Sequence, residues 1–131
     1  MKPAFNLMAA GGYVLAAEDS VVQAKQLQHL LEQYNMRNII CRNGQEALDQ
    51  AKAEMPLLII SDIVMPVMDG YTFCKTVKTD PELRNIPFIL LTSLSDPLDI
   101  IKGLQAGADN FITKPYEEKY LISRINYLLT N

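Results

Sequence analysis

The chain has 131 residues, enough for one domain with its own hydrophobic core but not for two. Its 49% hydrophobic and 21% charged residues are ordinary for a globular protein, and a net charge of −3 argues against a nucleic-acid surface. No apolar stretch reaches the roughly 18 residues that a membrane span needs. We therefore expect a cytoplasmic domain without membrane contact or direct nucleic-acid contact.

The first twelve residues differ from the rest of the chain. They hold a weak apolar stretch and a Gly11-Gly12 pair, without the apolar region and cleavage site of a signal peptide. We interpret residues 1–12 as an N-terminal extension or cloning remnant and assign the folded domain to residues 13–131. Cys41 and Cys74 are too few for a disulfide framework, so we expect reduced thiols.

Short apolar segments alternate with segments of helical periodicity along this domain. The strands are predicted at Tyr13–Ala17, Asn38–Cys41, Leu57–Ser61, Phe88–Leu91 and Asn110–Ile112. The helices are predicted at Val21–Tyr34, Gln45–Ala53, Tyr71–Lys78, Leu98–Ala106 and Lys119–Leu129. Because the strands are continuously apolar, we expect a parallel sheet that is buried on both faces. The pattern predicts a doubly wound α/β domain of five strand–helix units.

Acidic residues follow two of the predicted strands directly. Glu18 and Asp19 come after the first strand, and Asp62 comes after the third. Ligands of such sheets bind beyond the carboxyl ends of the strands, and clustered carboxylates hold a proton or bind a hard cation. Mg²⁺ suits this oxygen-rich set. We expect Asp19 and Asp62 as direct ligands, Glu18 acting through water, and the backbone carbonyl of Val64 as a further ligand.

Two more polar residues end the later strands and point to phosphoryl transfer. A carboxylate becomes a phosphoryl acceptor when a metal and cations offset the charge of the incoming group. Asp62 suits this role because it follows the middle strand of the pattern. Lys114 would pair with Asp62 at rest and with a phosphoryl oxygen afterwards, and Thr92 would supply a hydroxyl hydrogen bond.

Four segments of the chain carry a joint pattern: Val14-Leu-Ala-Ala-Glu-Asp-Ser20, Ile60-Ser-Asp-Ile-Val-Met-Pro-Val-Met-Asp-Gly70, Leu91-Thr-Ser93 and Gly107-Ala-Asp-Asn-Phe-Ile-Thr-Lys-Pro115. Together they resemble the receiver domain of two-component response regulators and hybrid histidine kinases, over about residues 13–130. The resemblance implies a flavodoxin-like (βα)5 fold with strand order 2-1-3-4-5. It also implies a switch formed by Thr92 and Phe111, and a cis peptide bond between Lys114 and Pro115.

The resemblance further implies a phosphoacceptor signalling domain rather than an enzyme. Its partner would be a histidine kinase or a histidine phosphotransfer protein, and phosphorylation of Asp62 would switch the output surface between two states. The abrupt end at Asn131 favours a domain from a larger protein, such as a hybrid histidine kinase, over a stand-alone regulator. A homodimer through the last two helices is left open.

Three other functions are weighed against this one. A phosphatase of the haloacid dehalogenase type also forms an aspartyl phosphate, but it needs an acid where this chain has Val64. A flavodoxin-like cofactor binder would need a phosphate in the first loop, where Glu18-Asp19 would repel it. A scaffold that is never phosphorylated would have no need of the complete acidic set.

The residues beside the acceptor bear on the lifetime of the phosphorylated state. Hydrolysis of the acyl phosphate needs a water in line with the scissile bond, and neighbouring side chains orient or exclude that water. Val64 and Leu94, two positions after Asp62 and Thr92, are both apolar. We therefore expect slow self-dephosphorylation.

Overall fold

The computed structural model describes residue 8 and residues 10–130. Its strands are β1 (Val14–Ala17), β2 (Asn38–Cys41), β3 (Leu58–Ser61), β4 (Phe88–Thr92) and β5 (Asn110–Thr113). Its helices are α2 (Val21–Gln33), α3 (Gly44–Ala53), α4 (Gly70–Thr79), α5 (Pro97–Gln105) and α6 (Glu118–Thr130). The alternation predicted from the apolar periodicity is confirmed, with boundaries that differ by a residue or two.

All five strands found in the described residues run parallel in one sheet, in the order β2-β1-β3-β4-β5. Val14 of β1 is in register with Asn38 of β2 on one side and with Leu58 of β3 on the other. The chain therefore passes from β1 to β2 on one side, returns past β1 to β3, and continues through β4 to β5 on the other side. This reversal between β1 and β3 is the switch point at which such sheets bind ligands, and it confirms the expected flavodoxin-like topology.

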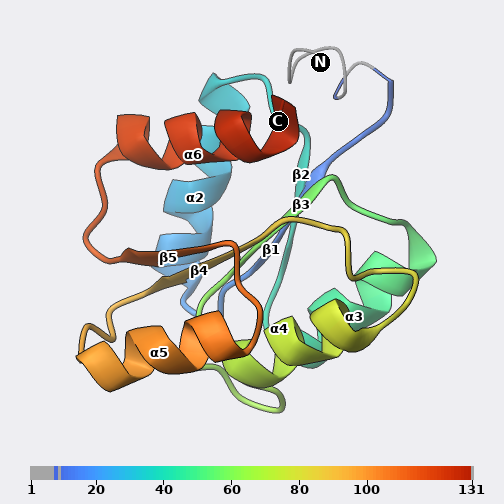
Figure 1. Ribbon diagram of the computed structural model, residues 1–131. Coiled ribbons are helices and arrows are strands. Elements are labelled where there is room, and N and C mark those ends of the chain that lie inside the picture. Colours follow the sequence, from blue (N-terminus) through green and yellow to red (C-terminus); the bar gives the residue numbers. More distant parts are fainter. Residues whose placement is uncertain (1–7, 9, 131) are drawn as a thin grey trace.

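Helices cover both faces of the sheet, α2 and α6 on one and α3, α4 and α5 on the other (Figure 1). Successive side chains of a strand point to opposite faces. In β1, Val14 and Ala16 join the core under α2 and α6, whereas Leu15 and Ala17 join the core under the other helices. Since both faces are buried, every residue of β1 is apolar.

Polar residues at the helix N-termini fix where the helices begin. The side chains of Ser20, Asn43, Asp69 and Asp96 each accept a hydrogen bond from a backbone N–H in the first turn. In α5 the capping Asp96 is followed by Pro97 in the first turn, where a missing N–H costs no helical hydrogen bond. Because each helix follows a parallel strand, these N-termini lie at the same edge of the sheet as the carboxyl ends of the strands.

Only part of the N-terminal segment is described by the structure. Residues 1–7 and 9 of the predicted extension lie outside the described residues, whereas Met8 packs in the core beneath α2 and α6.

Both cysteines are free thiols, and burial raises the pKa of Cys74 to about 12. None of the helices described here is both long and apolar enough to cross a membrane.

Val67 occupies a strained backbone conformation in the loop between β3 and α4. Its φ is +70°, and the N–H of Met68 donates to the carbonyl oxygen of Pro66 at 2.8 Å, which closes a γ-turn around it. A β-branched residue is rare at positive φ, and such strain costs on the order of 1–3 kcal/mol. Val67 is 81% exposed, so its side chain adds little packing in return.

Val67→Gly is therefore expected to stabilise the protein. Glycine removes the strain but loses more entropy on folding, by roughly 0.5–1 kcal/mol, so the net gain should be about 1 kcal/mol. Urea unfolding of both proteins measures it. A free energy of unfolding that falls in the glycine variant would contradict this account of the turn.

Candidate functional site

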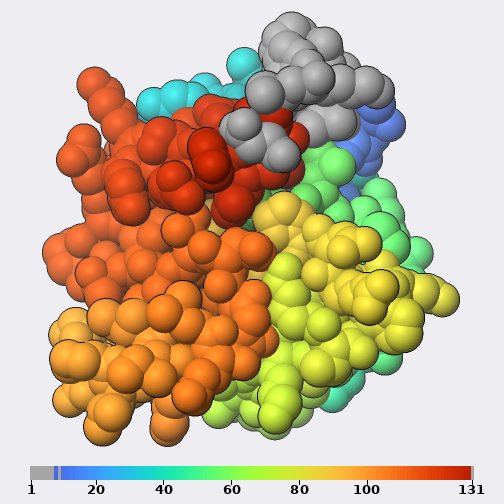
Figure 2. Space-filling model, viewed as in Figure 1, coloured from blue at the N-terminus to red at the C-terminus, as the bar shows by residue number. Residues whose placement is uncertain are grey.

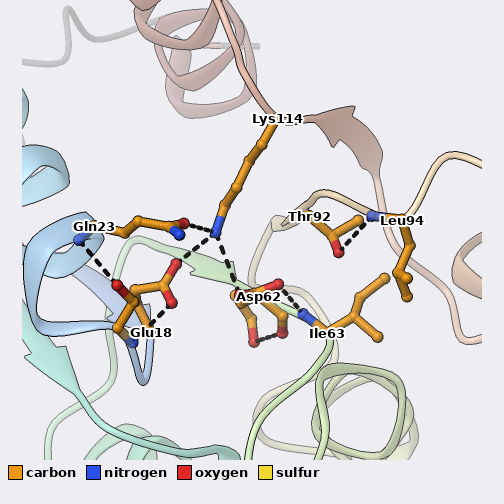
Figure 3. Close-up of polar contacts among 9 residues, drawn as sticks. Glu18, Gln23, Asp62, Ile63, Thr92, Leu94 and Lys114 are labelled. Carbon is orange, nitrogen blue, oxygen red and sulfur yellow. Dashed lines mark hydrogen bonds and ion pairs between the residues drawn. The ribbon is translucent and has the colours of Figure 1, made fainter.

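The predicted site residues come from four strand ends and meet at one edge of the sheet. Glu18 and Asp19 follow β1, Asp62 follows β3, Thr92 is the last residue of β4, and Lys114 follows β5. These strands are neighbours in the sheet, in the order β1, β3, β4, β5. Figure 3 shows Glu18, Asp62 and Lys114 converging from their separate elements, with Thr92 beside them.

Three carboxylates form a tight acidic cluster at this edge. Oxygens of Glu18, Asp19 and Asp62 all lie within 4.8 Å of one another. The side chain of Glu18 is 6% exposed and that of Asp62 is 14% exposed, whereas Asp19 is exposed to solvent. Burial raises the pKa of the Glu18 carboxyl, and the negative charge of Asp62 adds to that rise. An oxygen-only set of this kind fits a hard divalent cation such as Mg²⁺.

Lys114 bridges two of these acids. Its Nζ lies 2.6 Å from Oε1 of Glu18 and 3.3 Å from Oδ2 of Asp62. The expected contact with Asp62 is present, but Glu18 is the nearer carboxylate. The ammonium also donates to the side-chain oxygen of Gln23 in α2. Lys114 therefore reaches the Asp62 carboxylate, but its two nearer hydrogen-bond acceptors are Glu18, in the loop between β1 and α2, and Gln23, in α2.

The backbone around Asp62 is held from several directions. Its N–H donates to the carbonyl oxygen of Ala17 at 2.9 Å, and its Oδ1 accepts from the N–H of Ile63 at 2.7 Å. The N–H of Gly70 donates to the carbonyl oxygen of Ile63 at 2.8 Å, which ties the start of α4 to the same loop. One carboxylate oxygen of Asp62 is therefore anchored, and the other faces Lys114.

Thr92 and Phe111, the residues of the predicted switch, lie at the end of β4 and within β5. Thr92 is buried, and its Oγ1 accepts a hydrogen bond from the N–H of Leu94 at 3.2 Å. This contact leaves the hydroxyl proton of Thr92 available as a donor. Phe111 is half-buried, and its ring packs against α5 where Gly103 has no side chain: a Cβ there would lie 2.7 Å from Cδ2 of Phe111.

The remaining predictions concern the loops around the acceptor. Val64 lies in the loop after β3 and is 63% exposed, and Leu94 is half-buried beyond the end of β4. The peptide bond between Lys114 and Pro115 is cis, as the resemblance implied. The metal-ligand role of the Val64 carbonyl remains a prediction, as do the chemical roles of the other site residues.

Gln23 is the site residue that the sequence analysis missed. It is exposed near the start of α2, with no position in the strand-end pattern that revealed the other residues. Gln23 stands three residues after Ser20, which is the spacing of a capping box. The sequence therefore predicts a contact within the helix and gives no sign of a contact outside it. Lys114, which follows β5, is far from Gln23 in the sequence and contacts it only in the folded chain.

Comparison with known proteins agrees with this geometry. The family model of the response regulator receiver domain matches residues 14–126. The receiver domain of a signal transduction histidine kinase from Syntrophus aciditrophicus is 48% identical, with a TM-score of 0.86, covering 91% of this chain and 90% of that one. Response regulator PleD of Caulobacter vibrioides is 35% identical over 115 residues, which are 88% of this chain and 25% of PleD. Histidine kinase P4 of Formosa agariphila is 38% identical over 119 residues, which are 90% of this chain and 8% of that protein.

A doubly wound sheet with an acidic cluster and a lysine at the carboxyl ends of its strands fits the phosphoacceptor site of a signalling domain. The chain belongs to the response regulator receiver domain family. It is thus a receiver domain of two-component signalling, and nothing in the comparisons or the site supports a haloacid dehalogenase-type phosphatase. The chain spans only a quarter of PleD, so the family assignment describes this domain and not a whole protein.

Proposed function

We propose that Asp62 accepts a phosphoryl group from a phosphohistidine of a histidine kinase or a histidine phosphotransfer protein. The observation that carries this proposal is the arrangement around Asp62. Its carboxylate lies within 4.8 Å of Glu18 and Asp19 and 3.3 Å from the Lys114 ammonium. Acids alone would repel a phosphoryl group, so the cation of Lys114 and a bound metal are both needed to offset the charge.

Asp19 and Asp62 would hold Mg²⁺ directly, with Glu18 acting through water and the Val64 carbonyl completing the protein ligands. Bound there, Mg²⁺ supplies positive charge that stabilises the oxygens of the transferring phosphoryl group. Glu18 is buried and already accepts from Lys114, which suits an outer role better than direct ligation. The exposed carboxylate of Asp19 is open to solvent, where a hydrated ion would arrive.

The reaction itself requires little movement of the chain. A carboxylate oxygen of Asp62 forms the new O–P bond as the N–P bond of the donor phosphohistidine breaks, and the released imidazole takes a proton from solvent. The N–H of Ile63 holds one Asp62 oxygen at 2.7 Å, so the carboxylate is oriented before the donor arrives. Lys114 then binds a phosphoryl oxygen.

Thr92 and Phe111 would convert phosphorylation into a change of surface. The Thr92 hydroxyl donates to a phosphoryl oxygen, which draws the end of β4 toward Asp62. That movement gives the half-buried ring of Phe111 a second position and shifts the population between two states of the surface around α5, β5 and α6. Figure 2 shows α5, in orange, and α6, in red, on one face of the molecule, where a partner would detect the change. The parent protein would be a multidomain regulator or a hybrid histidine kinase.

Beryllofluoride, which mimics an acyl phosphate when it binds a carboxylate, tests the proposed function in solution. We expect amide NMR shifts at Asp62, Thr92 and Phe111 that need both Mg²⁺ and beryllofluoride. Shifts that leave out Asp62, or shifts that form equally well without Mg²⁺, would contradict the proposed site.

Val64→Asn is expected to shorten the lifetime of the phosphorylated state. The wild-type loop offers no polar side chain at this position to orient a water, so the label should persist well beyond seconds in a chase. Asparagine adds one hydrogen bond to that water, worth about 0.5–1.5 kcal/mol, which predicts roughly two- to tenfold faster decay.

Val67→Asn is the matched control because it places the same side chain at an exposed position of the same loop. Its decay rate should equal that of the wild type. Loss of the wild-type label within seconds, or equal decay in the Val64 and Val67 variants, would contradict the role of Val64.

A further inference from the structure

The first turn of α2 departs from the capping pattern that its sequence predicts. Ser20 is the N-cap and Gln23 stands three residues later, a capping box in which the glutamine side chain reaches back to the backbone N–H of the serine. In the structure that N–H donates instead to Oε2 of Glu18 at 3.1 Å. The Gln23 side chain is therefore free of its usual capping contact.

Gln23 directs its side-chain oxygen at the Lys114 ammonium instead (Figure 3). The other half of the capping box is kept, since the backbone N–H of Gln23 donates to Oγ of Ser20 at 3.3 Å. Glu18, Ser20, Gln23 and Lys114 thus form a closed ring of hydrogen bonds. The contact with Ser20 fixes the backbone of Gln23 at the helix N-terminus independently of Lys114.

This ring determines how the three N–H donors of the ammonium are used. One donates to Oε1 of Glu18 at 2.6 Å and one to Gln23, and the third reaches Asp62 Oδ2 at the longer distance of 3.3 Å. The two closer acceptors, Glu18 and Gln23, belong to the loop between β1 and α2 and to α2 itself. These two closer contacts would compete with a phosphoryl group on Asp62 for the ammonium.

We infer that Gln23 is a positioning residue that holds Lys114 in the resting state and releases it when Asp62 carries a phosphoryl group. The inference rests on the proposed function. Gln23 is exposed and lines a cavity of about 590 Å³ between α2 and the loop after β5. Water therefore replaces Lys114 at the amide, and the release leaves no buried unpaired group. The contact makes activation less favourable and so sets its threshold.

The test compares beryllofluoride affinity at saturating Mg²⁺ in Gln23→Met and Gln26→Met. Gln26 lines the same cavity from the same helix, without a hydrogen bond to Lys114, which makes it the matched control. Loss of one net hydrogen bond to the resting lysine predicts about two- to tenfold tighter binding in Gln23→Met. The Gln26 variant should bind as the wild type does, whereas Gln23→Glu, which keeps an acceptor and adds a charge, should bind more weakly.

A purely capping role makes a different prediction. Loss of a cap lowers the stability of the fold, which urea unfolding measures, without tightening beryllofluoride binding. Unchanged or weaker affinity in Gln23→Met would therefore overturn the inference, whatever the stability shows. Equal tightening in Gln26→Met would overturn it as well, because the effect would then belong to the cavity and not to the contact.

A second measurement separates this inference from the proposed function. The Lys114 ammonium signal in ¹⁵N NMR of the unphosphorylated protein, assigned by its loss in Lys114→Ala, should exchange faster with water in Gln23→Met than in Gln26→Met. Equal exchange would overturn the resting contact even if Asp62 is phosphorylated normally. If the wild type bound no beryllofluoride, the proposed function and the release step would both fail, and faster exchange would then establish the contact alone.

Discussion

A protein carrying Asp62→Asn is expected to take up no phosphoryl group from labelled acetyl phosphate, with or without Mg²⁺. The side-chain amide has no nucleophilic oxygen of carboxylate character and removes one negative charge from the proposed metal site. The fold should remain, because the amide oxygen still accepts from the N–H of Ile63, as Oδ1 does at 2.7 Å in the wild type. Loss of labelling would then report chemistry and not unfolding.

Asp69→Asn is the matched control for this experiment. Asp69 is exposed and caps α4 by accepting from the N–H of Thr72 at 2.8 Å, a role that asparagine fills equally well. Its labelling should equal that of the wild type, and circular dichroism should be alike for all three proteins. Label retained in the Asp62 variant would overturn the acceptor assignment.

Gly70→Ala is expected to have the largest effect on stability. A Cβ at Gly70 would lie 2.1 Å from the carbonyl oxygen of Asp62 and 2.8 Å from Cα of Ile63. Both atoms belong to the backbone, so relief requires the acceptor loop to move away from α4. We expect a loss of about 3 kcal/mol or more in the free energy of unfolding, even though alanine is favoured in helices by up to about 1 kcal/mol.

Gly103→Ala provides the comparison for the Gly70 variant. A Cβ there would meet Cδ2 of Phe111 at 2.7 Å and Cδ1 of Leu90 at 3.0 Å, which are side-chain atoms that rotate away. The loss of stability should therefore be clearly smaller than for Gly70→Ala in the same urea titration. Equal losses, or a stable Gly70 variant, would contradict the close approach of α4 to the acceptor loop.

The fold was predictable because its signals are local. Continuous apolar runs such as Phe88–Leu91 are typical of strands buried on both faces, and β4 is buried along its whole length. The helix predicted at Leu98–Ala106 is present as α5, which begins at Pro97 after the capping Asp96. The strand order came from the family resemblance, since no local pattern states which strands are neighbours.

The site was predictable only in part. Strand ends identified Asp62 and Lys114, because parallel strands bring their carboxyl ends to one edge. The side-chain geometry followed from other contacts. Lys114 lies nearer to Glu18 than to Asp62, and it also donates to Gln23, while the Ser20 N–H donates to Glu18. Sequence spacing does not show that the side chain of Lys114, which follows β5, contacts Gln23 in α2.

The most direct test of the central claim is the intact mass of the wild-type protein after incubation with acetyl phosphate, with and without Mg²⁺. We expect the mass of one phosphoryl group to be added in the presence of Mg²⁺, and peptide mapping to place it on Asp62. An unchanged mass, or a modification that forms equally without Mg²⁺ or on another residue, would contradict a phosphoacceptor function for this receiver domain.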